Sequence, residues 1–405
     1  MDIAVFLPNW LGDVVMSTPV LRSMREHFGS DAHIVGIMRP YLREVLGGTD
    51  WLDQQWFFHP KSKEPELRRA ALIERMRRKR FDLAVLLPNS FSSAVTVWRG
   101  RVRERVGYAR DGRGPLLTKR IIPRRHGALP WSRLVDEPMV DHYIRLAEAV
   151  GCPAPSRQLE LRATEEDDRA ADMIWDNLGL RDDGRVITLN SSGAYGGAKL
   201  WPVEHFAALA GRLVEQLDHD VLVMCGPNER EIARDVVKQS GSPRVFSMAD
   251  QPLGIGAAKA CMARGRLMVS TDSGPRHIAA ALGKPLVTVF GPMLSVWSEN
   301  PTQRATNLHL DIDCIGCHKR VCPLGHHRCM RDLSVDRVYQ AVVGLLEEES
   351  KDVNVYFTRT SRGNIPQVLQ CLETQPEQEI EHLDADRMHP KKEYVISAES
   401  ELKLP

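Results

Sequence analysis

The chain has 405 residues, of which 43% are hydrophobic, so it can bury more than one core, because single cores stop growing below about 300 residues. Its 54 lysines and arginines stand against 53 aspartates and glutamates, and the formal net charge of +1 excludes a chain-wide attraction to nucleic acid or to anionic lipid. We therefore expect two domains, and any anion that the protein recognises must be bound locally.

The sequence predicts neither a signal peptide nor a membrane span. The chain begins Met1-Asp2, with no basic segment before its first apolar run. No stretch stays apolar for the roughly eighteen residues that a span needs. Four cysteines are scattered and the other four, Cys314, Cys317, Cys322 and Cys329, lie close together, unlike the disulfide framework of a small secreted domain. We expect a soluble cytoplasmic protein with reduced thiols.

Short apolar runs alternate with amphipathic stretches through the first half, which is typical of a parallel sheet with helices on both faces. The predicted strands are 3–7, 33–38 and 83–87, and the predicted helices are 14–28 and 65–80. A proline-rich stretch at 152–155 interrupts the alternation and predicts a linker.

A second series follows, with strands predicted at 186–189, 221–225, 267–270 and 286–290 and helices starting near Pro202, Asn228 and Gly274. We therefore predict two doubly wound, Rossmann-like α/β domains facing each other across a cleft, at 1–155 and 156–350. A helix at 335–349 ends the second domain. The polar stretch 351–405 predicts a largely disordered tail.

Asp13 follows the first predicted strand, just before a helix. Ligands of open α/β sheets bind at the carboxyl ends of the strands, so Asp13 is a candidate general base for an attacking hydroxyl. An Asp next to a Gly before a helix is also typical of a helix cap, and a helix N-terminus stabilises the ionised form, which weakens a base. Both interpretations stay open.

Three segments of the second half are candidates for binding a nucleotide. The loop 190–199 offers glycines, the hydroxyls of Ser191 and Ser192, and Lys199, which suit a diphosphate, although a flexible loop explains the glycines equally well. Glu229 follows a strand, where a carboxylate could accept both ribose hydroxyls or simply sit in a helix's first turn. The turn Thr271-Asp272-Ser273-Gly274-Pro275-Arg276-His277 favours anion binding at a helix N-terminus, whereas His277 alone would suit a structural histidine.

Five blocks in order resemble the ADP-heptose:lipopolysaccharide heptosyltransferases, glycosyltransferase family 9, and most closely their heptosyltransferase II branch. The blocks are Asn9-Trp10-Leu11-Gly12-Asp13-Val14-Val15-Met16, Leu87-Pro88-Asn89-Ser90-Phe91, Gly107-Tyr108-Ala109-Arg110-Asp111-Gly112-Arg113, Ala198-Lys199-Leu200-Trp201-Pro202-Val203-Glu204-His205-Phe206 and Asp272-Ser273-Gly274-Pro275-Arg276-His277. The match extends to about residue 350. It implies a GT-B fold and an inverting transfer of L-glycero-D-manno-heptose to the inner core of lipopolysaccharide.

The resemblance also implies roles for single residues. Asp13 matches the family's base, and the residues that match its ADP-heptose site are Lys199, Glu229, Asp272, Ser273, Gly274 and His277. Ser191 and Ser192 join these donor-binding candidates through their hydroxyls rather than through the resemblance. The acceptor, a Kdo and heptose chain linked to lipid A, would be bound by Asn9, Asn89, Ser90, Arg110, Arg113 and Arg120. No cofactor is implied, no nucleic acid is a partner, and a peripheral contact with the inner face of the inner membrane is left open. Departures at 190–192 and at Leu200 bear on donor specificity.

Two clusters keep alternative interpretations. Basic residues between Arg110 and Arg125 suit the carboxylates and phosphates of an inner-core acceptor, or form a solvated charged surface. The cysteines at 314, 317, 322 and 329 have ligand types compatible with a structural zinc ion, but we predict no metal there and favour reduced or redox-sensitive thiols.

Three rival functions remain. The chain could transfer another sugar or use another acceptor, it could bind a nucleotide without turnover, or it could be a dehydrogenase that binds a dinucleotide. No Gly-x-Gly-x-x-Gly follows the first strand, which counts against the dehydrogenase.

Overall fold

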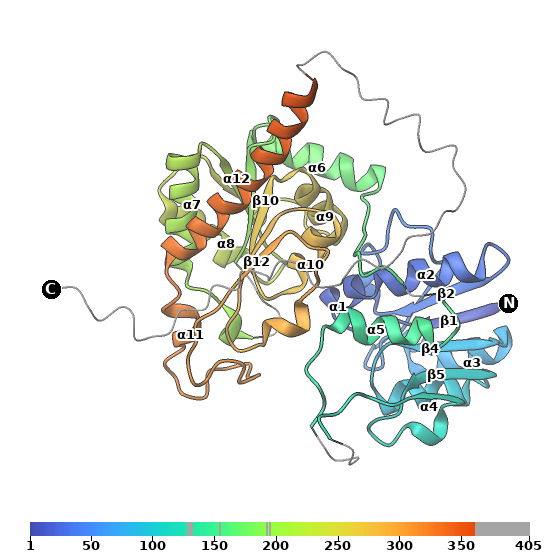
Figure 1. Cartoon of the computed structure of the whole chain (residues 1–405). Helices are drawn as coiled ribbons and strands as arrows, with labels where there is room; N and C mark the ends of the chain where they lie inside the picture. The colour runs from blue at the N-terminus through green and yellow to red at the C-terminus, as the bar shows by residue number, and fades with distance from the viewer. Residues whose placement is uncertain (128–132, 154, 192, 194–195, 361–405) are drawn as a thin grey trace.

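The computed structural model describes residues 1–127, 133–153, 155–191, 193 and 196–360, with side chains described as far as residue 348. The chain forms two α/β halves side by side (Figure 1). Among the described residues, no helix is long and apolar enough to cross a membrane.

The first half is a parallel six-stranded sheet with the order β3-β2-β1-β4-β5-β6. Its strands are β1 (Asp2–Phe6), β2 (His33–Met38), β3 (Gln54–Phe57), β4 (Leu83–Leu86), β5 (Glu104–Tyr108) and β6 (Lys119–Ile121). Its helices are α1 (Leu11–Met16), α2 (Thr18–Phe28), α3 (Arg69–Lys79), α4 (Phe91–Arg99) and α5 (Met139–Glu148). The central strands β1 and β4 are almost wholly buried, as strands covered on both faces must be.

The second half repeats this plan, with the parallel order β12-β11-β10-β7-β8-β9. Its strands are β7 (Val186–Asn190), β8 (Asp220–Met224), β9 (Val245–Ser247), β10 (Leu267–Thr271), β11 (Leu286–Val289) and β12 (Ala305–Leu308). Its helices are α6 (Glu165–Leu178), α7 (Val203–Leu217), α8 (Arg230–Ser240), α9 (Ile255–Arg264), α10 (Gly274–Ala281), α11 (Arg328–Arg331) and α12 (Val335–Thr360). The predicted pair of doubly wound α/β sheets is therefore confirmed.

The structure differs from the sequence prediction at three helices. The helix expected over 14–28 is two helices that meet at Ser17, because Pro19 belongs to the first turn of α2, where its missing amide costs nothing. The helix expected over 65–80 begins as a short 3-10 turn, and α3 starts at Arg69. The last helix continues to Thr360 instead of ending at 349, and the rest of the predicted tail, 361–405, lies outside the described residues.

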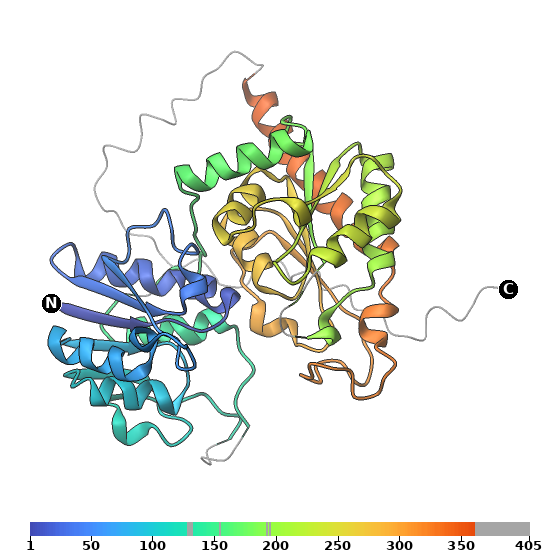
Figure 2. The same cartoon turned by 180° about the vertical axis from the view of Figure 1, so that it is seen from behind.

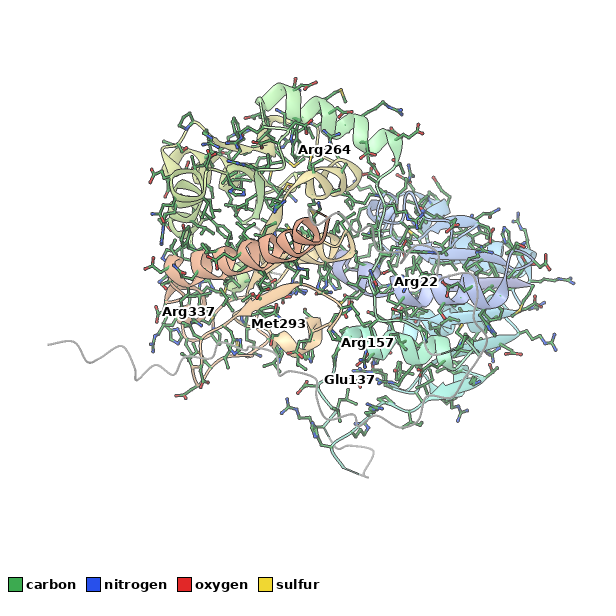
Figure 3. The ribbon with its side chains drawn as sticks, turned by 45° about the horizontal axis from the view of Figure 1, so that its top comes forward. Arg22, Glu137, Arg157, Arg264, Met293 and Arg337 are labelled. Atoms are coloured by element: carbon green, nitrogen blue, oxygen red, sulfur yellow. The ribbon has the colours of Figure 1, made fainter. Side chains whose placement is uncertain are left out.

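The segment between α5 and α6 carries the chain from the first sheet to the second. Its described residues form neither helix nor strand, and we propose the domain boundary here, at residues 155 and 156. After this segment α6 packs on α9, where Arg264 lies close to α6 (Figure 3). The Arg264 guanidinium is 2.5 Å from the Asp172 carboxylate of α6. Figure 2, the view from behind, shows α6 on the second half together with α12.

The two halves touch at α1 and α10, in the middle of the molecule (Figure 1). Two glycines permit this close approach. A Cβ atom at Gly12 would lie 2.7 Å from Cδ2 of His277, and one at Gly274 would lie 2.8 Å from Cδ2 of Leu11. Any larger residue at either glycine would push the two helices apart.

A buried lysine joins the halves at a second place. Lys259 of α9 is fully buried, and its ammonium group donates to the carbonyl oxygens of Glu44 (3.2 Å) and Gly47 (2.9 Å) in the first half. The same group is 3.1 Å from the carboxylate of Asp167 in α6. In return, the Glu44 carboxylate accepts the amide of Gly256, in the first turn of α9.

Candidate active site

The strand order of each sheet reverses at one point, and the candidate residues lie at those points. In the first sheet, Asp13 follows β1 and Asn89 follows β4, and these two strands are neighbours. In the second sheet, Lys199 follows β7 and Asp272 follows β10, which are also neighbours. Ligands of doubly wound sheets bind at such switch points, outside the carboxyl ends of the strands.

Asp13 lies in the first turn of α1, but the residue in the capping position is Trp10. No side chain caps this helix. The Asp13 carboxylate instead accepts a hydrogen bond through Oδ1 from the hydroxyl of Tyr143 in α5, at 3.0 Å. The contact therefore ties Asp13 to α5 rather than to its own helix.

Burial is the largest influence on the acidity of Asp13, and it raises the pKa of this carboxyl group. The hydrogen bond from Tyr143 acts in the opposite direction, the negative charge of Asp272 raises the pKa further, and the positive charge of Lys199 lowers it. The net direction of these influences is upward. A carboxylate with a raised pKa holds a proton more strongly, as a general base needs to.

Lys199 ends the short 3-10 helix η4 (Gly197–Lys199), and its ammonium group is bound to the turn after β10. It donates to the carboxylate oxygen Oδ2 of Asp272 at 2.6 Å and to the Asp272 carbonyl at 2.8 Å. The other carboxylate oxygen of Asp272 accepts the hydroxyl of Ser298 at 3.3 Å. Both charged side chains are about nine-tenths buried, so they are screened little by solvent.

The turn after β10 leads directly into α10, with Ser273 in the capping position and Gly274 as the first helical residue. The Ser273 hydroxyl accepts from the amide group of Asn190 at 2.8 Å, which joins the ends of β7 and β10. His277 is buried against Gly12, and burial keeps the pKa of its imidazole well below the usual range. His277 is therefore neutral, and the helix N-terminus carries the local positive potential.

The remaining donor candidates are placed less centrally. Ser191 is buried, and in the described part of the chain its hydroxyl has no hydrogen-bond partner. Ser192 lies outside the described residues. Glu229 precedes α8, beyond the end of β8, and its carboxylate accepts the amide of Gly226 at 2.8 Å. The structure thus brings Asp13, Lys199 and the turn after β10 together and places Glu229 one strand away.

Two acceptor candidates line a hollow at the carboxyl ends of β1, β2 and β4. Asn9 and Ser90 share this hollow with Arg39, whose guanidinium donates to Asn9 Oδ1 at 2.7 Å. Asn9 is exposed and Ser90 is half-buried, so a polar ligand can reach both. The hollow adjoins α1, which starts two residues after Asn9.

Arg113 lies inside the first half rather than at its surface. Its side chain is fully buried, and its guanidinium donates to the carbonyls of Tyr108 and Pro88 at 2.7 and 2.5 Å and to the side chain of Asn89 at 2.9 Å. Burial lowers the pKa of Arg113 to about 10. Arg113 and Asn89 therefore hold the loop after β4, and their contact with an acceptor stays a prediction.

Other basic residues of the first half remain accessible. Arg110 is half-buried, 3.2 Å from the carboxylate of Asp111. Arg120 is exposed on the edge strand β6, and Arg124 is exposed just beyond it. These positions are compatible with both the acceptor-binding and the solvated-surface interpretations.

The cysteine segment touches the Lys199 turn. His327 donates to the carbonyl of Ala198 at 2.7 Å, and the amide of Ala198 donates to the carbonyl of Arg320 at 3.1 Å. Gly196 allows this approach with φ +150°, because a Cβ there would lie 2.6 Å from the Arg320 carbonyl oxygen. The segment therefore helps to hold the turn that presents Lys199.

The four clustered cysteines are near one another. Burial and the neighbouring thiols raise the pKa of Cys329 to about 11, whereas backbone amides that surround Cys322 lower the pKa of that thiol. Within the residues that the structure describes, no three His, Cys, Asp or Glu side chains are arranged to hold a metal ion. The zinc alternative therefore gains no support from the geometry.

Several contacting residues were not recognised in the sequence. Tyr143, Asn190 and Ser298 each bond a predicted site residue, but they lie 130, 83 and 26 positions from it. Asn190 is the last residue of β7 and stood at the start of the candidate loop 190–199, but it was not singled out as a site residue. Tyr143 and Ser298 carry no motif of their own.

Comparison with known proteins identifies the family to which the chain is similar. The model of glycosyltransferase family 9 (heptosyltransferase) matches residues 69–327, which include Lys199 and Asp272. Lipooligosaccharide heptosyltransferase 2 of Campylobacter jejuni and lipopolysaccharide heptosyltransferase 2 of Salmonella typhimurium are each 26% identical to the chain, over 86% of it and 99% of the relative.

Solved structures show the same fold. A family 9 glycosyl transferase from Veillonella parvula has a TM-score of 0.71 at 23% identity and covers 86% of this chain and 97% of its own. The ADP-heptose LPS heptosyltransferase II of E. coli has a TM-score of 0.68 at 23% identity, covering 86% and 100%. The predicted GT-B fold is confirmed by these neighbours. The chain belongs to glycosyltransferase family 9, the heptosyltransferases.

Proposed function

We propose that the protein transfers L-glycero-D-manno-heptose from ADP-heptose to the inner core of lipopolysaccharide, as a heptosyltransferase II. Relatives that match 86% of this chain over 99% of their own length carry the name heptosyltransferase 2. The observation that carries the proposal is the junction of α1 and α10, where a carboxylate with a raised pKa stands opposite a lysine and a helix N-terminus. A base facing an anion site is what transfer from a nucleotide sugar to a hydroxyl requires.

The donor is bound mainly by the second half. The Lys199 ammonium and the amides at the start of α10 face the diphosphate, and Ser273 and His277 fix the shape of that turn. Glu229 meets the ribose at the end of β8. Lys199 and the helix N-terminus supply the positive charge that stabilises the departing ADP, so we propose that no metal ion is required.

The acceptor is bound by the first half, at the hollow lined by Asn9, Arg39 and Ser90. Its hydroxyl attacks the anomeric carbon of heptose on the face opposite to ADP. The O–H bond of the acceptor breaks as its proton passes to Asp13, a new C–O bond forms, and the bond to the diphosphate breaks with its electrons leaving on ADP. Attack on the opposite face inverts the anomeric configuration. Because the acceptor is a lipid, we also propose a peripheral contact with the cytoplasmic face of the inner membrane.

The test is incubation of the purified protein with ADP-heptose and a heptosyl-Kdo acceptor, followed by mass spectrometry. We expect one added heptose, undiminished by a chelator. Competition with a panel of other nucleotide sugars tests the identity of the donor. If another nucleotide sugar inhibits the transfer more strongly than ADP-heptose competes with itself, that sugar rather than heptose is the one transferred. ADP binding without any transfer would reduce the protein to a nucleotide-binding module.

A further inference from the structure

Tyr143 is the side chain that bonds the Asp13 carboxylate. It belongs to α5, which packs beside α1 on the first half, and it is 3% exposed. Its hydroxyl donates to Oδ1 of Asp13 at 3.0 Å, across 130 positions of the sequence. This hydroxyl is therefore aimed at one of the two oxygens of the carboxylate, and Oδ2 is left on the other side.

The helix that carries Tyr143 is fixed from its opposite side. The neighbouring residue, His142, stacks on the ring of Tyr108 with the ring centroids 3.8 Å apart and the planes 12° from parallel. The Tyr108 hydroxyl donates to the His142 carbonyl at 2.8 Å, and the His142 ring is 3.0 Å from the side chain of Asn89. Two consecutive residues of α5 thus face the loop after β4 and the carboxylate after β1, so the position of Tyr143 is determined by packing on both sides.

We propose that Tyr143 is a positioning residue for the transfer: it holds Oδ1 of Asp13 and leaves Oδ2 as the oxygen that receives the acceptor proton. The inference rests on the proposed function, in which Asp13 is the base. A carboxylate that rotates freely offers its proton-accepting oxygen in many directions, whereas one held by a single hydrogen bond offers it in one.

The charged and titratable groups that face Asp13 come from four other elements. They are Tyr143 of α5, Asp272 after β10, Lys199 of η4, and Tyr41 in the first half. His277 of α10 packs against the adjacent Gly12 and is neutral. Burial and the charge of Asp13 keep the pKa of Tyr143 well above its usual value, so this hydroxyl stays protonated and donates throughout the working pH range.

The sign of the effect follows from these contacts. The hydrogen bond from Tyr143 stabilises ionised Asp13 and lowers its pKa. Removing the hydroxyl leaves the burial and the charge of Asp272 unopposed by this bond, so the pKa of Asp13 rises. The activity then needs a higher pH to keep Asp13 ionised.

The experiment compares Tyr143→Phe with wild type in the full chain, by transfer rate against pH and by ADP affinity. We expect the rate to fall on the order of tenfold, the acidic limb of the profile to move to higher pH, and ADP affinity to stay unchanged. Tyr339→Phe is the matched control, because it removes the hydroxyl of another buried tyrosine, which belongs to α12 and packs in the core of the second half rather than beside Asp13. Its acidic limb should stay in place.

The other outcomes overturn the proposal. If Tyr143→Phe lowers the transfer rate but leaves the acidic limb of the pH profile in place, Tyr143 contributes packing only. If the transfer rate is unchanged, Tyr143 has no role in the reaction. If Tyr143→Phe fails to fold, a difluorotyrosine at 143 keeps the shape with a stronger donor, and it should move the limb to lower pH; no movement ends the proposal.

A measurement without substrate separates this inference from the proposed function. The carboxyl carbon of Asp13 can be followed by NMR in aspartate-labelled protein, with Asp13→Asn identifying the signal. Its titration should move to higher pH in Tyr143→Phe whether or not heptose is the sugar. If the wild-type protein transfers no heptose, the function is wrong; if the titration does not move, the role of Tyr143 is wrong.

Discussion

Asp13 lies in two environments that have opposite effects on the charge of its carboxyl group. It stands in the first turn of a helix, which favours its charge, and in a buried junction, which opposes its charge. Burial has a larger effect on its pKa than the Tyr143 hydrogen bond or the charges of Asp272 and Lys199. The sequence identified the residue through its place after a strand, but it could not show the junction, because Asp272 and Tyr143 are distant in the chain.

We predict that Asp13→Asn lowers the transfer rate on the order of a hundredfold or more, because an amide cannot accept the acceptor's proton. Binding of ADP should persist, since Lys199 and α10 are unchanged. Steady-state transfer and calorimetric ADP binding check both statements. Near wild-type transfer by this variant would mean that another carboxylate is the base.

The same variant has a predicted pH-dependent effect on stability. The pKa of Asp13 is raised in the folded protein, so ionised Asp13 reduces stability above the ordinary pKa range of aspartate. This reduction disappears as the pH falls below that range, because the carboxyl group is then protonated in both states. Asp13→Asn should therefore melt at the same or a higher temperature at neutral pH, with the gain lost in acid. Thermal unfolding at several pH values tests the direction, and a loss of stability at neutral pH contradicts it.

Lys199→Ala should weaken ADP binding by roughly 1.5 to 3 kcal/mol, the range for a hydrogen bond to a charged group. The change also removes the lysine that balances the buried carboxylate of Asp272 and leaves it the hydrogen bond from Ser298, so the fold should lose stability as well. The double variant with Asp272→Ala removes that second effect and recovers stability without recovering ADP affinity. Equal ADP affinity for wild type and Lys199→Ala would remove this lysine from the site.

At the scale of elements, the sequence predicted most of the central strands, but it missed those at the sheet edges and the interior strand β5. Strand β2 was predicted with the bounds that the structure has because five apolar or small residues follow His33 without interruption. Strands β3, β6, β9 and β12 are short and include Gln, Lys, Ser or Asn, because edge strands are covered less and need fewer apolar residues. Their pairing depends on a sheet that the local sequence does not describe.

We predict that Gly12→Ala lowers both activity and stability, by about 1 to 3 kcal/mol for stability, because the added methyl group overlaps the ring of His277. Gly344→Ala is the control, since a Cβ there meets nothing within 4 Å inside α12. That change should stabilise the protein by roughly 0.5 to 1 kcal/mol and leave transfer untouched. Chemical denaturation and transfer assays of both variants compare a glycine whose Cβ position is occupied by a neighbour with one whose Cβ position is empty.

His327→Ala should raise the donor KM several-fold, because its ring holds the carbonyl of Ala198 next to Lys199. The control His326→Ala alters the adjacent ring, which contacts Cys314 and the backbone amide of Arg328. Donor kinetics that change equally in both variants would show a general effect of the cysteine segment, and not a contact with the turn.

At the scale of the whole molecule, the fold could be predicted but the contacts between the halves could not. Repeated strands and helices indicate two sheets, and the sheet order follows a common rule. The contact of Lys259 with the carbonyls of Glu44 and Gly47 gives no such pattern, because these residues are more than two hundred positions apart. A buried lysine in an amphipathic helix was invisible in the sequence for the same reason.

Lys259→Ala should lower the free energy of unfolding by about 1 to 3 kcal/mol. The change removes two hydrogen bonds to carbonyls of the first half and one ion pair with α6. Because the two hydrogen bonds join the halves, we also expect the halves to unfold separately. The exposed Lys238→Ala on α8 is the control and should change little. Calorimetry distinguishes one transition from two. A single transition at the wild-type temperature would show that α1 and α10 alone couple the halves.

The ion pair of Lys199 with Asp272 has a consequence for selectivity. The carboxylate acts as an internal counterion, so a ligand that approaches this lysine has to compete with a partner already in place. A small anion such as inorganic phosphate offers only its charge and gains little from the exchange. A nucleotide also contributes its base and ribose contacts, and these can outweigh the loss of the ion pair. If Lys199 binds the donor as proposed, we expect inorganic phosphate to compete weakly with a complete nucleotide for this site.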